Sequence, residues 1–219
     1  MVTRVKICGI TERAHALAVA EAGADFLGLV FAPGKRQLAP EEARRIAEAV
    51  RKANNAIEIV GVFVNTPSSE VNQTAAFCRL DLIQLSGDES WEYCREITLP
   101  IIKAFRVSRQ RPEEICAELS AGARTLSPKR FIALLDSQVK GRYGGTGMRF
   151  NWRIAQQVAL RFPTIIAGGL EPDNVAEAIK TVAPWGVDVS SGVEVRGVKD
   201  VAKIRAFIEA ARRADENRT

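Results

Sequence analysis

The chain has 219 residues, of which 47% are hydrophobic and 26% charged, so it is long enough for one large globular domain or two small ones. Its 31 basic and 26 acidic residues give a net charge of +5; the basic residues are dispersed and aromatics are few, which argues against nucleic acid as the partner and suits an anionic small molecule. No run of about eighteen apolar residues is present, and the first residues lack the apolar core of a secretory signal, so we expect a cytoplasmic protein without membrane contact.

The predicted elements alternate along the whole chain: short apolar runs rich in β-forming residues are followed by longer amphipathic runs rich in Ala, Glu and Arg. Strands are predicted, in order, at 4–10, 25–31, 57–64, 81–85, 100–105, 131–136, 163–168 and 186–190. Helices are predicted at 12–23, 40–53, 68–79, 88–97, 112–122, 151–161, 171–182 and 199–213.

Most of the apolar runs are continuous, as in strands buried on both faces. Eight βα units in succession predict an α/β fold, and eight is the number that closes a (β/α)8 TIM barrel. We therefore predict a single-domain barrel over residues 1–219. An open, doubly wound sheet is the alternative; it is less favoured because no dinucleotide-binding fingerprint follows the first strand.

In such a barrel the chemistry lies at the carboxyl ends of the strands. The first strand ends at Cys8, directly before Gly9. This cysteine is either a small buried filler or a positioned thiol. The loop after the second strand carries Arg36 beside Lys35, which is either a solvated pair or a planar fork for a carboxylate.

The sixth strand closes with Asp136 after the apolar run FIALL. A helix cap or a surface carboxylate is the plain alternative to a catalytic acid. The loop that follows, 137–150, is long and holds several glycines, so we expect it to be functional or to be a flexible connector.

Glycine-rich turns follow the seventh and eighth strands, at AGGL (167–170) and SSG (190–192). Neighbouring loops of this kind build the phosphate site common in these barrels, since glycines let backbone N–H groups approach an anion. The hydroxyls of Ser190 and Ser191 are candidate additional donors. The two turns together predict phosphate binding.

The remaining unusual residues favour structural roles. His15 lies in an Ala-rich helix far from the strand ends, and as the only histidine it argues against multi-histidine metal sites and histidine-based triads. We expect the thiols of the cysteines to be reduced. Packing roles are expected for Cys78, Cys94, Cys116, Trp91, Trp152 and Trp185.

Several motifs, in order and over nearly the whole chain, resemble those of the phosphoribosylanthranilate isomerases. They are KICGIT (6–11), LGLVF (27–31), VGVFVN (60–65), LLDS (134–137), AGGLEPDNV (167–175) and GVDVSSGVE (186–194). The resemblance implies an Amadori rearrangement of N-(5-phosphoribosyl)anthranilate in tryptophan biosynthesis, with a small phosphorylated substrate and no cofactor or metal.

The resemblance also assigns roles to residues. Cys8 would be the general base and Asp136 the general acid, Arg36 would hold the anthranilate carboxylate, and Asp188 would lie near the substrate. Phosphate-binding backbone would come from Gly145, Gly168, Gly169, Ser191 and Gly192. The chemistry calls for a raised pKa at Asp136 and a lowered pKa at Cys8.

Two positions depart from the family pattern: Ser86 stands where a histidine is common, and Asn151 where an aspartate is common. Other phosphosugar barrels, such as pentose-phosphate epimerases and histidine-pathway isomerases, are alternatives, as is a non-catalytic phospholigand-binding module. Too few histidines and no clear two-fold repeat argue against the first two. The sequence leaves the oligomeric state open between monomer and homodimer.

Overall fold

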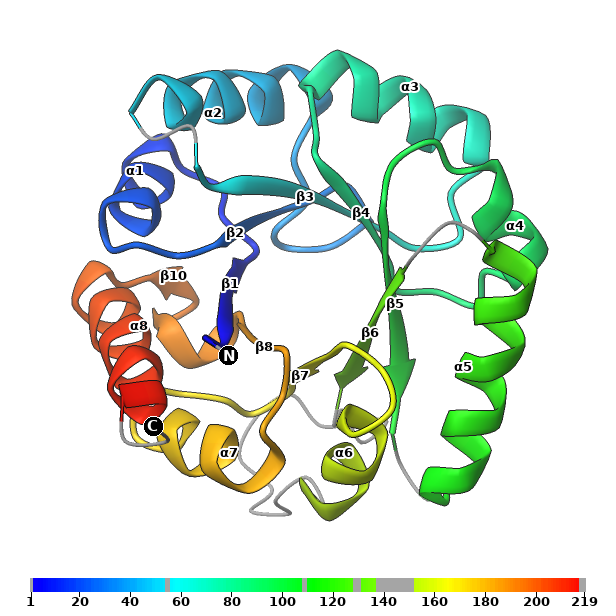
Figure 1. Ribbon diagram of the computed structural model, residues 1–219. Helices are drawn as coiled ribbons and strands as arrows, with labels where there is room; N and C mark the ends of the chain where they lie inside the picture. The colour runs from blue at the N-terminus through cyan, green and yellow to red at the C-terminus, as the bar shows by residue number, and fades with distance from the viewer. Residues whose placement is uncertain (1, 54–55, 108–109, 128–130, 137–151, 217–219) are drawn as a thin grey trace.

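The computed structural model describes residues 2–53, 56–107, 110–127, 131–136 and 152–216, which form a closed ring of parallel strands enclosed by helices (Figure 1). The strands of the ring are β1 (Arg4–Cys8), β2 (Phe26–Val30), β3 (Glu58–Phe63), β4 (Leu82–Leu85), β5 (Ile101–Arg106), β6 (Phe131–Asp136), β7 (Thr164–Ala167) and β8 (Gly186–Val189). The helices are α1 (Arg13–Glu21), α2 (Pro40–Ala53), α3 (Ser68–Cys78), α4 (Trp91–Glu96), α5 (Pro112–Leu126), α6 (Trp152–Ala159), α7 (Val175–Val182) and α8 (Val201–Glu216).

The ring closes because the first strand pairs with the last. β1 pairs in parallel with β2 on one side and with β8 on the other, where Val5 lies opposite Val187. Each remaining strand pairs with its neighbours in chain order. The chain is therefore a TIM barrel, and the alternative of an open sheet is wrong.

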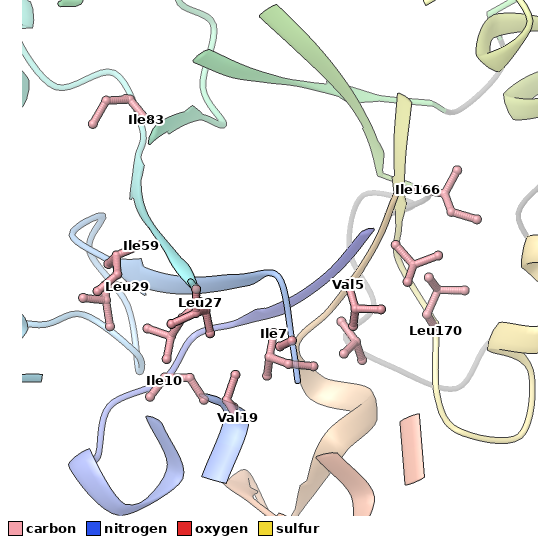
Figure 2. Close-up of a cluster of buried hydrophobic side chains, with 14 of the residues drawn as sticks. Val5, Ile7, Ile10, Val19, Leu27, Leu29, Ile59, Ile83, Ile166 and Leu170 are labelled. Atoms are coloured by element: carbon pink, nitrogen blue, oxygen red, sulfur yellow. The ribbon is translucent and has the colours of Figure 1, made fainter. Parts of the chain in front are cut away.

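The main hydrophobic core lies between the ring and its helices. Figure 2 shows Ile7, Leu27 and Ile59 pointing away from the barrel axis, and Ile10 and Val19 beside them near α1. These side chains are essentially inaccessible to solvent. Their burial explains why the strands read as continuous apolar runs: one face packs on the helices and the other fills the barrel.

A second, smaller cluster fills the inside of the barrel. Phe26, Val60, Leu82, Ile102 and Leu134 belong to it. Side chains alternate between the two faces of a strand, so the next inward positions toward the carboxyl ends include Gly28 after Phe26 and Gln84 after Leu82. The interior thus changes from apolar to polar toward the carboxyl ends, and the barrel mouth forms there.

The opposite end of the barrel is closed by aspartates that precede even-numbered strands. Asp25 accepts a hydrogen bond from the backbone N–H of Val5 at 2.7 Å and pairs with Arg212 of α8 at 2.8 Å. Asp81 repeats the arrangement two strands later, before β4, and accepts from the N–H of Ile59 at 2.8 Å. These carboxylates satisfy strand-end amides that have no ladder partner.

The observed strands agree with the predicted ones to within two residues at every boundary. The largest difference is at the first strand, which ends at Cys8 rather than at residue 10 because Gly9 turns the chain at φ +75°. The loop after β8 holds elements that the sequence did not predict: a short 3-10 turn, Ser191–Val193, and an antiparallel pair formed by β9 (Glu194–Val195) and β10 (Val198–Lys199).

Candidate active site

A buried polar cluster lies at the carboxyl end of β1. Cys8 and Lys6 share the inward face of this strand, and the Lys6 ammonium donates to Asp188 Oδ1 of β8 at 3.0 Å. All three side chains are buried, and Lys6 is completely inaccessible. A charged pair is held so deep in a barrel only when it is closely matched, as it is here.

Gly28 of β2 makes room for this cluster. A Cβ atom at that position would lie 2.9 Å from Cys8 Sγ and 3.1 Å from Lys6 Nζ. Both distances are shorter than ordinary van der Waals contact. A side chain at residue 28 would therefore displace the thiol or the ammonium group.

Burial and neighbouring charges have opposing effects on the pKa values of Cys8 and Lys6. Burial raises the pKa of the Cys8 thiol, Lys6 lowers it and Asp188 raises it, and the net direction is upward. Burial alone would lower the pKa of Lys6, but the charges of Asp188 and Cys8 outweigh burial and raise it, so Lys6 stays an ammonium. The expectation of a lowered pKa at Cys8 is wrong, because desolvation of the thiolate exceeds the attraction of the neighbouring ammonium, Lys6, which is already paired with Asp188.

Cys8 is therefore expected to titrate above the ordinary range of a thiol, about 8.5. The measurement is the thiolate ultraviolet absorbance of the wild-type chain minus that of Cys8→Ala, followed from about pH 6 to about pH 10 so that the other cysteines cancel. In a Lys6→Met background the same difference should move to still higher pH, because the lowering charge is gone. A midpoint below about 8.5 would contradict this account.

The same raised pKa makes stability depend on pH. The folded chain holds the Cys8 proton more tightly than the unfolded chain does. This contribution to stability is therefore complete below the unfolded pKa of about 8.5, and it declines as the pH rises toward the folded value.

Asp136 ends β6 at the same end of the barrel. It lies opposite Arg106 of β5 and Ala167 of β7 in the strand register, and it is half-buried. Leu134, two residues earlier, belongs to the interior cluster, so alternation along the strand turns Asp136 inward as well. Cys8 and Asp136 thus approach the same mouth from β1 and β6.

Arg36 lies in the loop between β2 and α2 and meets an acidic partner from the β8 side of the barrel. Its Nε donates to Glu194 Oε1 and its Nη2 to Glu194 Oε2, both at 2.9 Å. Lys199, opposite Glu194 in the β9–β10 pair, donates to the same Oε1 at 2.9 Å. The Arg36 guanidinium therefore holds an internal carboxylate, and its binding of a ligand carboxylate stays a prediction.

Gly9 leaves room for the side chain of Arg36. A Cβ atom there would overlap with Arg36 Cδ and lie 3.1 Å from Ser190 Oγ. The Arg36 side chain therefore crosses the backbone directly behind Cys8. Gly9 is required by this crossing and by its positive φ, which side chains disfavour.

The loops after β7 and β8 adjoin, as the predicted phosphate site needs. Gly168 and Gly169 have φ of +88° and +67°, and a Cβ atom on Gly192 would overlap with the carbonyl oxygen of Leu170. Ser191 and Gly192 begin the 3-10 turn on the β8 side. The predicted phosphate residue Gly145 lies outside the described residues, as does Asn151.

Ser190 forms a hydrogen bond within the chain through its hydroxyl group. Its Oγ donates to the carbonyl oxygen of Cys8 at 3.1 Å, and its own carbonyl accepts from Lys199 Nζ at 2.8 Å. The hydroxyl thus links β1 to the β8 loop, and its suggested role as an additional donor stays a prediction.

The loop after β4 contains Ser86 and a rigid anchor. Gln84 donates to Ser86 Oγ at 3.0 Å, and its Oε1 is buried without a hydrogen-bond partner among the described residues. Glu89 pairs with the buried Lys103 at 3.1 Å and accepts from the N–H of Asn65 at 2.8 Å. These contacts join the loops after β3 and β4 to strand β5.

The residues predicted to be structural lie away from the mouth or pack in the core. His15 of the outer helix α1 lies 3.6 Å from Glu12, and the helix cysteines Cys78, Cys94 and Cys116 are buried and not in disulfide bonds. Among the described residues, no cluster of three or more His, Cys, Asp or Glu side chains is arranged to hold a metal ion. None of the helices in the described part of the chain is long and apolar enough to cross a membrane.

Sequence reasoning missed four residues of the site: Lys6, Gly28, Glu194 and Lys199. For two of them a signal existed. Lys6 precedes Cys8 by two residues and so shares its face, and a glycine inside the strand LGLV marks a close approach. For Glu194 and Lys199 there was no local signal, because the residues that they contact are distant in sequence or belong to a hairpin of two-residue strands.

Comparison with known proteins places this chain in a family. The profile of N-(5'phosphoribosyl)anthranilate (PRA) isomerase matches residues 5–210. The N-(5'-phosphoribosyl)anthranilate isomerase of Dehalococcoides mccartyi is 49% identical over 216 residues, covering 98% of both chains.

Solved structures agree. The phosphoribosyl anthranilate isomerase of Thermotoga maritima superposes with a TM-score of 0.83 at 41% identity, covering 96% of this chain and 98% of the other. A phosphoribosyl anthranilate isomerase in complex with reduced 1-(o-carboxyphenylamino)-1-deoxyribulose 5-phosphate gives a TM-score of 0.79 at 39% identity, with coverage of 96% and 98%.

Proposed function

Because the chain belongs to the N-(5'-phosphoribosyl)anthranilate isomerase family of tryptophan biosynthesis, we propose that it converts N-(5-phosphoribosyl)anthranilate to 1-(2-carboxyphenylamino)-1-deoxyribulose 5-phosphate, with Cys8 as general base and Asp136 as general acid. The observation that carries the assignment of residues is that β1 and β6 end in an inward thiol and an inward carboxyl group at one end of the barrel. A sugar bound across the mouth would meet both groups.

The first step opens the furanose ring. The Asp136 carboxyl group gives its proton to the ring oxygen while the C1′–O bond breaks, and the lone pair of the anthranilate nitrogen forms the C1′=N bond. The product is an open-chain cationic Schiff base and an Asp136 carboxylate. Asp136 must be protonated when the substrate binds, because it acts as the acid in this step.

The second step moves a proton from carbon to sulfur. The Cys8 thiolate takes the C2′ hydrogen, the C–H electrons form the C1′=C2′ bond, and the nitrogen recovers its lone pair. The resulting enolamine tautomerises to the ketone by protonation at C1′ and loss of the 2′-hydroxyl proton. Lys6 supplies a fixed positive charge beside the sulfur, and the Schiff-base cation adds a second one as the reaction proceeds, which offsets the raised pKa of Cys8.

The two anionic ends of the substrate hold the sugar in register with these groups. We assign the anthranilate carboxylate to Arg36 and the phosphate to backbone amides of Gly168, Gly169, Ser191 and Gly192, together with Gly145. Asp188 acts close to the substrate through its pairing with Lys6. Fixing both ends would align C2′ with the thiol and the ring oxygen with the carboxyl group.

Turnover of the substrate tests the proposal directly. Purified protein should consume N-(5-phosphoribosyl)anthranilate with no metal added, seen as a steady fall of the anthranilate-type fluorescence. The same preparation of Cys8→Ala serves as the background control. Binding of the substrate without its consumption would overturn the enzymatic proposal in favour of a phospholigand-binding protein.

A further inference from the structure

The β9–β10 pair carries a charged cluster whose members come from two loops of the mouth, the one after β2 and the one after β8. Glu194 lies opposite Lys199 in the pair, and both side chains are buried, with 7% and 3% of their surface exposed. Arg36 reaches them from the loop after β2, and its own side chain is 38% exposed. An arginine on a surface loop is thus held by a buried carboxylate, which a buried lysine holds in turn.

The contact between Arg36 and Glu194 is bidentate. Nε and Nη2 each donate to a separate carboxylate oxygen at 2.9 Å, which fixes the plane of the guanidinium as well as its position. Lys199 holds the carboxylate from the other side at 2.9 Å. Burial would raise the pKa of Glu194, but the bonds from Arg36 and Lys199 outweigh it and lower the pKa, so the carboxylate stays ionised.

The cluster is also tied to the catalytic strand. Lys199 donates to the carbonyl oxygen of Ser190 at 2.8 Å, and the Ser190 hydroxyl donates to the carbonyl oxygen of Cys8 at 3.1 Å. Two cations and one anion leave a net charge of about +1 in the cluster. The positive charge that remains after the charge of Glu194 has been compensated still attracts an anionic group of the substrate.

We propose that Glu194, anchored by Lys199, is a positioning residue that holds the Arg36 guanidinium in the orientation that receives the substrate carboxylate. The proposal rests on the proposed function, because it presumes a substrate with a carboxylate at Arg36. Glu194 itself does not contact the reacting atoms. It fixes the orientation of the Arg36 side chain before the substrate binds, so that less conformational entropy is lost on binding.

The test compares Glu194→Gln with the wild-type chain in steady-state turnover of N-(5-phosphoribosyl)anthranilate. We expect a KM about tenfold higher and a kcat changed less than about threefold, because binding is weakened while the acid and base remain in place. Glu48→Gln is the matched control: Glu48 accepts from Arg44 Nε at the same distance of 2.9 Å on the outer helix α2, and its loss should leave both constants unchanged.

A double-mutant cycle separates positioning from a general structural role. Arg36→Met should raise KM by about 10²-fold, and Glu194→Gln in that background should add nothing, because its effect passes through Arg36. Independent effects that multiply would overturn the proposal. So would a KM for Glu194→Gln that is unchanged, or one that is lower because Glu194 merely competes with the substrate.

Two further measurements keep the outcomes distinct. If Glu194→Gln does not fold by circular dichroism, Lys199→Met takes its place, since it removes the anchor but leaves the Arg36–Glu194 pair; a KM that stays at the wild-type value in that variant overturns the proposal. Absence of turnover in the wild-type chain would count against the proposed function. Normal wild-type turnover with no response to Glu194→Gln would count against the positioning role alone.

Discussion

Replacing Cys8 with alanine is expected to lower kcat by about 10²–10⁴-fold, the usual contribution of one general base. The thiolate is the group that we assign to removal of the C2′ proton, and the neighbouring Lys6 and Asp188 offer no equivalent base because they are paired with each other at 3.0 Å. KM should change little, since the carboxylate and phosphate contacts remain. Steady-state kinetics with the fluorescent substrate measures both constants.

Cys94→Ala is the matched control for this variant. Cys94 is also a buried cysteine outside any disulfide bond, but it packs in helix α4 away from the barrel mouth. It should lower stability modestly through the cavity it leaves and keep kcat within about twofold. A Cys8→Ala enzyme with a kcat close to the wild-type value would show that another group removes the proton.

Asp136→Asn is expected to lower kcat by a similar factor, about 10²–10⁴-fold. The amide has nearly the shape of the carboxyl group and fits the same position at the end of β6, but it has no acidic proton to give to the ring oxygen. Ring opening should then limit the rate. A substrate analogue with the ring already open should restore much of the rate in this variant, and it should not do so in Cys8→Ala.

Asp81→Asn controls for the change from carboxylate to amide. Asp81 lies at the opposite end of the barrel, where it accepts from the N–H of Ile59 and from Arg51. Its replacement should lower the thermal midpoint of unfolding without changing kcat. Equal losses of kcat in Asp81→Asn and Asp136→Asn would point to general destabilisation rather than to acid catalysis.

The architecture was predictable because its strands carry an unambiguous signal. Strands packed on both faces read as continuous apolar runs, and glycines or charged residues interrupt them at the turns, so even the end of β6 at Asp136 was placed correctly. The first strand was predicted too long because the apolar Ile10 continues the pattern. Only the positive φ of Gly9 reveals where the strand stops.

The site was less predictable, for two physical reasons. A barrel strand that is apolar on both faces does not show which face is inside, so the depth of Lys6 could be found only from its spacing to Cys8. The pairing of Arg36 with Glu194 joins residues 158 apart through a hairpin of two-residue strands. Hydrophobic periodicity reports local secondary structure and does not predict contacts between residues so far apart in sequence.

The direction of the Cys8 pKa shift shows a third limit. Chemistry demands a reactive thiolate, but the free site is arranged so that burial prevails over the ammonium of Lys6. The sequence reports which charges are present and not how far each is removed from water. A raised pKa also makes the Cys8 thiol less open to adventitious oxidation.

The seam between β1 and β8 has a consequence for how the enzyme is made. Lys6 and Asp188 are 182 residues apart and become neighbours only across that seam. Nearly the whole polypeptide must therefore leave the ribosome before the catalytic centre can exist, and a late, long-range closure of this kind is slow. Activity therefore requires the closed ring, and we expect a nascent chain truncated before β8 to be inactive.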